Sequence, residues 1–282
     1  MRKLLAIILA VALLSTMAVS AFAVDSPTAT GTEETQTAGT NIVVTVEDGA
    51  VEEGKLDLTD EVAAEKGDTL TFSGLESDTP TKVSFTLENP APTIVLRDTK
   101  TGEIVLGKLD GNTYTAIVNG DCQLEVVDNT HEYTDGPFAD WAKEGITMTS
   151  VLELLVGYPN GKFNPDGTLT GAQVITALAR LNAKLGGKKL VTTGEKWYEA
   201  PIAWAKEAGL TDGSDLFVPF ARQQLIDVLA KFAGIEDDST EWVVAAGLFV
   251  GNENGDLMPE NNLTRAQFAT VLYRYVNKII FG

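Results

Sequence analysis

Apolar and polar residues alternate with a period of two from Asn41 to about Asp128, the pattern of strands with one buried face. Turn signals rich in Gly, Asn and Asp separate the alternating runs, which are 42–46, 69–72, 82–87, 93–96, 103–106, 113–118 and 122–126. Thr101-Gly102 is expected to join 93–96 to 103–106 as a hairpin. These short strands predict a small β-sandwich over residues 41–128, in which 59–65 is a helical turn or an irregular loop.

Beyond Asn129 the period changes, and apolar residues recur at spacings of three and four, as in helices with one apolar stripe. The clearest stripes are Val174, Ala177, Leu178, Leu181; Leu225, Val228, Leu229, Phe232; and Phe268, Val271, Leu272, Tyr275. Earlier helices are expected to begin near Trp141, Pro201 and Trp242. The chain is therefore predicted to be an α+β multidomain protein, with an all-β domain followed by an all-α part.

Three stretches of the helical part look like divergent copies of one unit. Each copy contains a tryptophan, then a loop rich in Gly, Asn or Pro, and then a four-residue box at the start of a helix. The loops are 157–165, 212–219 and 251–259, and the boxes are 170–173, 221–224 and 264–267. Such a repeat predicts stacked supersecondary units, none of which buries its apolar face alone.

Each box has a mechanical role. In the first and third boxes, Thr170 and Thr264 can accept a hydrogen bond from the first helical turn, and a glutamine three residues later can reach back. The second box has Ala221 and lacks this hydroxyl. A calcium loop would also be rich in Asn, Asp and Gly, but in 252–256 the glycine falls too early and no glutamate stands at the twelfth position, so no metal site is predicted.

With these motifs in register, the sequence resembles the S-layer homology (SLH) family and carries three such copies, over 131–186, 194–235 and 236–279. The resemblance implies an all-α bundle with pseudo-threefold symmetry. It also implies binding of a secondary polysaccharide of the Gram-positive cell wall, often pyruvylated, in grooves between the copies. A ketal carboxylate suits a guanidinium, which offers planar bidentate hydrogen bonds.

The resemblance also implies a set of glycan-binding positions, which are Arg222, Arg265, Asp135, Trp141, Gly157, Tyr158, Glu199, Trp204 and Trp242. Arg222 and Arg265 match the motif arginine, and Glu199 replaces the early acid of the family pattern in the second copy. Gly171 stands where the first copy should carry the arginine, so one groove is expected to lack its main anion donor.

Each of these residues also has a structural interpretation. The tryptophans can be core anchors of their copies, and Asp135 can cap or turn the chain. Arg222 and Arg265 can be solvated, although a positive charge in the first turn of a helix opposes the helix dipole and requires another reason.

The N-terminus resembles a secretory signal peptide at residues 1–23, with a basic start, an apolar run and an Ala-x-Ala ending; the alternative is a membrane anchor. Residues 24–40 lack large apolar groups and are predicted to be a disordered tether. No other stretch reaches the ~18 apolar residues of a spanning helix, so no membrane span is expected after cleavage.

The formal net charge of −19 argues against nucleic acid as a partner, because phosphate binding requires a basic patch. The single histidine, His131, supports neither a catalytic triad nor a multi-histidine metal site, and the single cysteine, Cys122, is expected to be a buried, inert thiol. No catalytic residues and no cofactor are predicted.

Our leading hypothesis is an exported, non-catalytic protein of the cell surface that holds the wall polysaccharide. Because both the protein and the polymer are acidic, that binding must rest on short-range pairing. The alternative is that the degenerate copies have lost glycan binding and serve assembly with other surface-layer proteins, as Gly171 and Ala221 favour. An enzyme with chemistry in 41–128 is disfavoured, since that region has acids but no histidine and no nucleophile motif.

Overall fold

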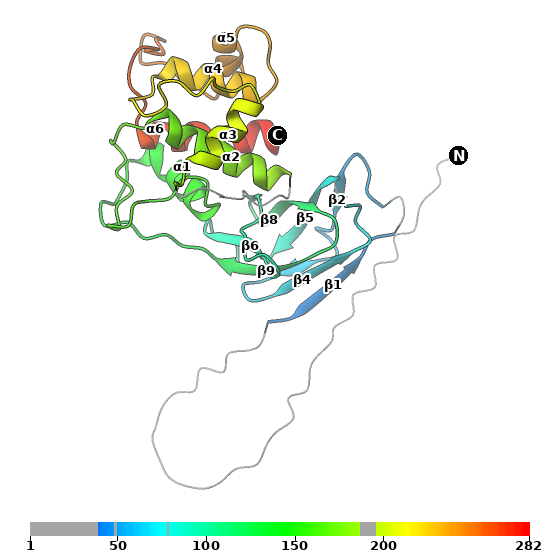
Figure 1. Cartoon of the computed structure of the whole chain (residues 1–282). Coiled ribbons are helices and arrows are strands. Elements are labelled where there is room, and N and C mark those ends of the chain that lie inside the picture. The colour runs from blue at the N-terminus through cyan, green and yellow to red at the C-terminus, as the bar shows by residue number, and fades with distance from the viewer. Residues whose placement is uncertain (1–38, 48–49, 78, 187–195) are drawn as a thin grey trace, which may run out of the picture.

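The computed structural model describes residues 39–47, 50–77, 79–186 and 196–282. Within these ranges every strand precedes residue 129 and every helix follows residue 139, which confirms the α+β class. Figure 1 shows the two parts side by side, and we call them the β-domain (39–128) and the helical domain (129–282). The predicted signal peptide and the tether up to Ala38 lie outside the described residues. None of the helices in the described ranges is long and apolar enough to cross a membrane.

The β-domain consists of two sheets. The first has the order β1-β4-β9-β6, formed by β1 (Asn41–Thr45), β4 (Thr69–Ser73), β9 (Cys122–Asp128) and β6 (Ile94–Asp98). The second has the order β2-β5-β8-β7, formed by β2 (Lys55–Asp57), β5 (Pro80–Leu87), β8 (Thr113–Asn119) and β7 (Gly107–Asp110), with β3 (Ala63–Ala64) also paired to β5. The register places Leu70 opposite Leu124 and Val83 opposite Ala116, and all four of these side chains are buried in one core.

Two details of the predicted strand series are wrong. Residues 103–106 do not form a strand: after the turn at Gly102, Ile104 makes one bridge to Arg97, and the chain then crosses to the second sheet as β7. The predicted hairpin is therefore reduced to this bridge and two flanking bonds, from Val105 N to Leu96 O (2.8 Å) and from Asp98 N to Glu103 O (2.9 Å). Two further strands were missed, β2 and β3, because runs of three and two residues are too short to show a period.

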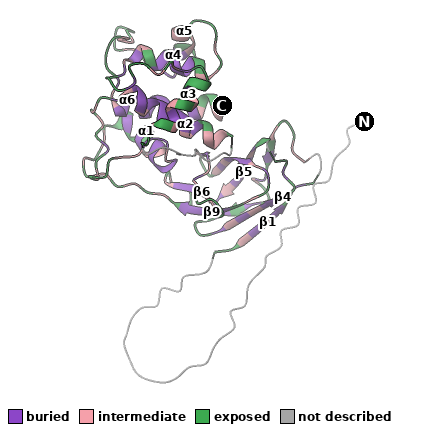
Figure 2. Ribbon diagram, in the orientation of Figure 1, coloured by how far each residue is buried: buried purple, intermediate pink, exposed green. Residues whose placement is uncertain are grey.

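Alternation of buried and exposed residues breaks down where the β-domain meets the helices. Ile94, Val95 and Leu96 in β6 are all buried, and so are the three residues 116–118 in β8. Val95 and Val127 belong to the same apolar cluster as the helices, whereas the other strand residues mostly pack between the two sheets. Figure 2 shows the buried segments continuing from the strands into the helices. The two domains therefore share a packed boundary.

The helical domain contains six α-helices and a final π-helix within the described residues. They are α1 (Asp140–Val151), α2 (Gly171–Leu185), α3 (Glu199–Glu207), α4 (Arg222–Phe232), α5 (Ser239–Ala245), α6 (Arg265–Tyr275) and η1 (Val276–Ile280). The helix starts predicted near Trp141, Pro201 and Trp242 are confirmed by α1, α3 and α5. The predicted apolar stripes of α2, α4 and α6 are buried, apart from the half-buried Phe232.

Helices pack in a cyclic order. We call the three predicted copies the first, second and third unit. The first unit contributes α1 and α2, the second α3 and α4, and the third α5 and α6. The first helix of each unit packs on the second helix of another: α3 on α2, α5 on α4, and α1 on α6. The chain order of helices therefore closes into a ring.

A ring of backbone hydrogen bonds lies where the three boxes begin. The Leu169 amide donates to Leu263 O (3.0 Å), the Leu263 amide to Phe220 O (2.8 Å), and the Phe220 amide to Leu169 O (2.9 Å). All three side chains are buried. Three residues at equivalent positions thus satisfy one another's buried backbone groups, so each unit depends on both others.

Candidate functional site

The loop before each box makes the same backbone turn in all three units. Asn164, Asp215 and Met258 have positive φ angles of 59°, 50° and 51°. The carbonyl of the next residue accepts a bond from the second helical position of another unit: Pro165 O from Ala266, Leu216 O from Ala172, and Pro259 O from Gln223, at 2.8–2.9 Å. These bonds hold the start of each helix against the loop of a neighbouring unit.

Arg265 lies where the third unit meets the first. Its Nε donates to Phe163 O (2.7 Å) and its Nη2 to Val156 O (2.8 Å), both in the loop of the first unit. Its Cζ lies 4.6 Å from the ring centroid of Tyr158 and 4.7 Å from that of Phe163. The guanidinium thus bridges two units through charged hydrogen bonds and cation–π contacts.

Arg222 occupies the equivalent place between the second and third units. Its Nε donates to Leu257 O (2.6 Å), and its Cζ lies 5.5 Å from the ring centroid of Phe249. It has one aromatic neighbour where Arg265 has two. Burial lowers the pKa of each arginine, partly offset by Asp256 near Arg222 and by the two nearby tyrosines, Tyr158 and Tyr133, and Asp135 near Arg265.

Gly171 takes this position between the first and second units. A Cβ on Gly171 would stand 2.9 Å from Leu216 Cδ2 and 3.1 Å from Phe220 Cδ2. Leu216 and Phe220 are buried at the same interface. Apolar side chains therefore fill the space that an arginine occupies at the other two interfaces.

The structural alternative that Arg222 and Arg265 are solvated is wrong, because both side chains are buried. Arg265 is only 2% exposed and Arg222 only 7%, and both are tied to backbone carbonyls. Neither is neutralised by a salt bridge within the described ranges. Both arginines thus support the loops, and each keeps a buried positive charge without a carboxylate partner. Such a charge is costly to bury, which makes both positions candidates for a functional role.

Gly157 and Tyr158 form the part of this site that faces outward. A Cβ on Gly157 would stand 2.4 Å from Tyr133 Cε1 and 2.7 Å from Lys162 O, so only glycine fits there. Its amide donates to Tyr133 Oη (3.1 Å). Tyr158 is 37% exposed, with one contact on Arg265 and another with Gln173, whose Nε2 donates to its Oη (3.5 Å).

Asp135 holds the loop of the first unit from inside. Its carboxylate accepts from the amides of Phe163 (3.0 Å) and Asn164 (2.7 Å). Partial burial acts to raise the pKa of Asp135, but these amide hydrogen bonds outweigh it, and the pKa lies below its ordinary value. Glu199 does not repeat this role in the second unit, since it is exposed and, among the described residues, its carboxylate is paired with Lys196 at 4.0 Å.

The three predicted tryptophans differ from one another. Trp141 is 58% exposed, whereas Trp204 and Trp242 are half-buried against the helical core, in line with a structural role. Trp204 also meets Phe232 edge to face at 6.2 Å. The structure does not gather the three around one groove, because each stands on the first helix of its own unit.

Sequence reasoning missed an exposed aromatic cluster on the second unit. Trp197 is 53% and Phe217 59% exposed, and both rings contact Tyr198, at 5.3 and 4.8 Å between centroids. The adjacent aromatic pair Trp197-Tyr198 was the available signal.

Two comparisons with known proteins agree with this geometry. The model of the S-layer homology domain matches residues 132–175 and 241–269. A cellulosome-anchoring protein of Acetivibrio thermocellus is 25% identical over 150 residues, which are 52% of this chain and 26% of that protein. The chain therefore covers about a quarter of that relative's length. Residues 132–175 and 241–269 of this chain are therefore segments of the S-layer homology type.

Proposed function

We propose that this chain is an exported, non-catalytic protein that attaches to the cell surface by binding an anionic, pyruvylated wall polysaccharide. One observation carries the proposal. The two segments matched by the S-layer homology model, 132–175 and 241–269, are the two that build the Arg265 site. The name of the relative, a cellulosome-anchoring protein, agrees with attachment, although the chain covers only 26% of it.

The Arg265 site can attract an anion despite the acidity of the chain. Arg265 opens helix α6, whose dipole adds favourable field for a negative group at its N-terminus. Its buried charge has no carboxylate partner, so a glycan carboxylate at the mouth of the site would complete the pairing. Tyr158 offers an exposed ring for a sugar face. At −19, the net charge provides no long-range attraction, and the affinity must come from these contacts.

We propose three S-layer homology copies around an approximate threefold axis, with unequal interfaces. The backbone ring 169–220–263 and the cyclic helix packing support the threefold arrangement. Arg265 marks the main site and Arg222 a second one, while Gly171 marks an interface closed by apolar packing. Residues 1–23 and 24–40 fit the proposal as a signal peptide and a tether.

A sedimentation assay on purified Gram-positive sacculi tests the proposal. The full mature chain should sediment with native sacculi and not with sacculi stripped of their secondary polysaccharide. Arg265→Met should weaken retention by about tenfold or more, since it removes the site's charged group. Arg274→Met is the matched control, because Arg274 lies on the same helix and donates to Leu248 O, away from the site. Equal retention on native and stripped sacculi would contradict the proposal.

The exposed cluster of Trp197 and Phe217 favours a second candidate, assembly with other surface proteins without glycan binding. Exposed aromatic groups of this kind are typical of protein interfaces. Under this alternative, Trp197→Ser combined with Phe217→Ser abolishes co-assembly on the surface, and Arg265→Met leaves it unchanged. If the double variant assembles normally, this candidate fails.

A further inference from the structure

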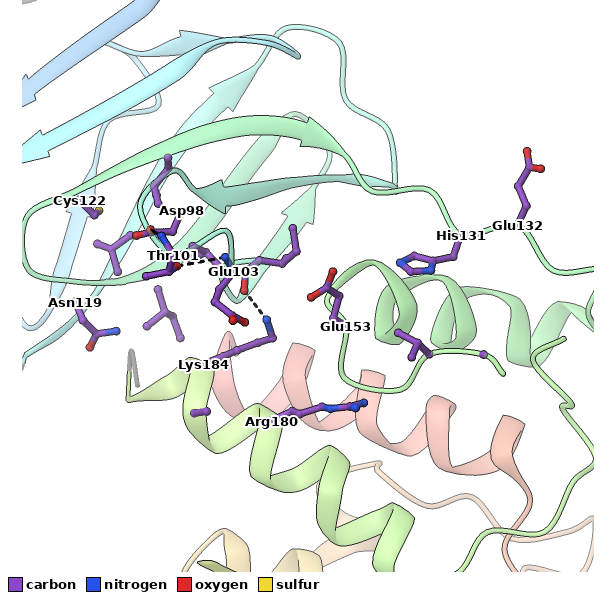
Figure 3. Close-up of a pocket in the computed structure, with 18 of the residues that line it drawn as sticks. Asp98, Thr101, Glu103, Asn119, Cys122, His131, Glu132, Glu153, Arg180 and Lys184 are labelled. Atoms are coloured by element: carbon purple, nitrogen blue, oxygen red, sulfur yellow. Dashed lines mark hydrogen bonds between the residues drawn. The ribbon is translucent and has the colours of Figure 1, made fainter. Parts of the chain in front are cut away.

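A cleft of about 810 Å³ lies between the β-domain and the first unit. Its walls come from the β6–β7 connection and the start of β9 on one side, and from α2 and the loop before it on the other. Figure 3 shows Lys184 extending from α2 toward Glu103 in the β-domain, while Arg180 lies along α2 beneath Glu153. This volume lies within the range of ligand-binding pockets.

The cleft is continuous with the Arg265 site. Gly157 and Tyr158 line the cleft, and Tyr158 is also the ring that stacks on Arg265. Val156 lines it too and supplies the carbonyl that Arg265 Nη2 binds. A ligand held at Tyr158 can therefore extend directly into the cleft between the domains.

Two cations one helical turn apart stand in the cleft, each bound to a backbone carbonyl. Arg180 Nη1 donates to Leu154 O (3.3 Å) and Lys184 Nζ to Ile104 O. Burial lowers the pKa of both groups, while Glu153 acts in the opposite direction on both and Glu103 does so on Lys184. Each cation keeps donors that a ligand oxygen can occupy.

The chemistry of the walls favours uncharged sugar residues over an anion. Asp98, Glu132 and Glu153 line the cleft, and these carboxylates would repel a second anionic group. Acceptors and donors on facing walls suit the hydroxyl groups of a sugar. Between them Val105, Tyr158 and Pro159, none of which is buried, provide apolar surface for the faces of sugar rings.

We infer that this cleft is a carbohydrate subsite, which binds uncharged sugar residues next to the charged residue held at Arg265. The inference rests on the proposed function and extends it. It assigns the β-domain a part in glycan recognition, through the loop 98–105. Arg180 and Lys184 hold the sugar hydroxyls, and Tyr158 connects the two subsites.

The test is calorimetric titration of the full mature chain with wall polysaccharide fragments of graded length, each ending in the charged residue. The wild-type affinity should rise by about tenfold from the shortest to the longer fragments, as charged hydrogen bonds are added. Lys184→Gln and Arg180→Gln should remove that rise and leave the affinity for the shortest fragment unchanged. Lys231→Gln is the matched control, since Lys231 is an exposed lysine on α4, far from the cleft lining.

A further variant, which leaves both cations in place, keeps the test valid if the first two variants misfold. Ala183→Trp fills the cleft from the partly exposed position between the two cations and should also abolish the length dependence. If long fragments keep their advantage in all three cleft variants, the subsite is refuted and the Arg265 site stands. If no fragment binds the wild type, the proposed function fails, and the subsite with it.

Discussion

Two interfaces of the helical domain share one backbone design but are filled by different side chains. Where the third unit meets the first, Arg265 reaches across to two carbonyls and lies between two aromatic rings. Where the first unit meets the second, Gly171 leaves room that Leu216 and Phe220 occupy. The helix-start amide bonds to the neighbouring loop are the same length within 0.1 Å, 2.9 Å for Ala266 and 2.8 Å for Ala172.

The packing of the three units therefore does not depend on the residue that carries the charge. The backbone ring and the buried Leu169, Phe220 and Leu263 hold the units together whichever residue opens the helix. A single position then decides whether an interface carries a buried charge or an apolar plug. A repeat can therefore lose its proposed binding role and still maintain the bundle.

The largest expected effect is that of removing Arg265. Arg265→Met should lower the free energy of unfolding by about 3 kcal/mol, because Phe163 O and Val156 O lose a charged donor and remain buried. Arg265→Lys should be intermediate, since it keeps the charge and loses the planar fork. Urea unfolding followed by tryptophan fluorescence measures both variants. A loss below that of Arg222→Met would contradict the ranking of the two sites.

Introducing the missing arginine should not create a third site. Gly171→Arg should destabilise the protein by about 2 kcal/mol, because its Cβ alone would overlap Leu216 and the core there is full. Retention on sacculi should not rise. Combining it with Leu216→Ala should recover part of the stability by making room, and thermal unfolding of the single and double variants checks this coupling. Gain of retention in the single variant would show that the interface is not closed.

Removing the threonine of the first or the third box should change the stability by less than the substitutions above. The Gln267 amide donates to Thr264 Oγ1 at 3.3 Å, whereas Thr170 Oγ1 turns to Gln173 Oε1 at 3.4 Å. Thr264→Ala should therefore cost about 1 kcal/mol and Thr170→Ala clearly less. Parallel urea titrations compare them, and equal losses would refute the distinction.

The smallest effect concerns pH. Because the folded pKa of Asp135 is lowered, its contribution to stability is present above the unfolded pKa of about 3.9 and is lost as the pH falls through the folded value. Below about pH 4, the melting temperature of Asp135→Asn should therefore fall less steeply with decreasing pH than that of the wild type. Melting temperatures across the acid range for both chains provide the measurement. Parallel curves would show that the two amide bonds do not lower this pKa.

The repeat pattern predicted the helical elements well, because the helix stripes and box residues lie close together in sequence. It also predicted which interface lacks an arginine, since Gly171 is visible in the chain. It did not predict that Arg265 would be buried, because Phe163, Val156 and Tyr158 lie more than 100 residues away along the chain. Nor did it predict the bond from Lys184 to Ile104 O in the β-domain, which requires knowing how the two domains pack.

The sequence alone determined the α+β order of elements, the repeat and the identity of the residue at each helix start, because period, capping and turn chemistry are local. Only the tertiary structure decided where those residues act. It turned two arginines inward onto backbone carbonyls, closed one interface with Leu216 and placed a cleft between the domains. The physical reason is that burial and charge compensation depend on neighbours brought together by packing, which no local pattern records.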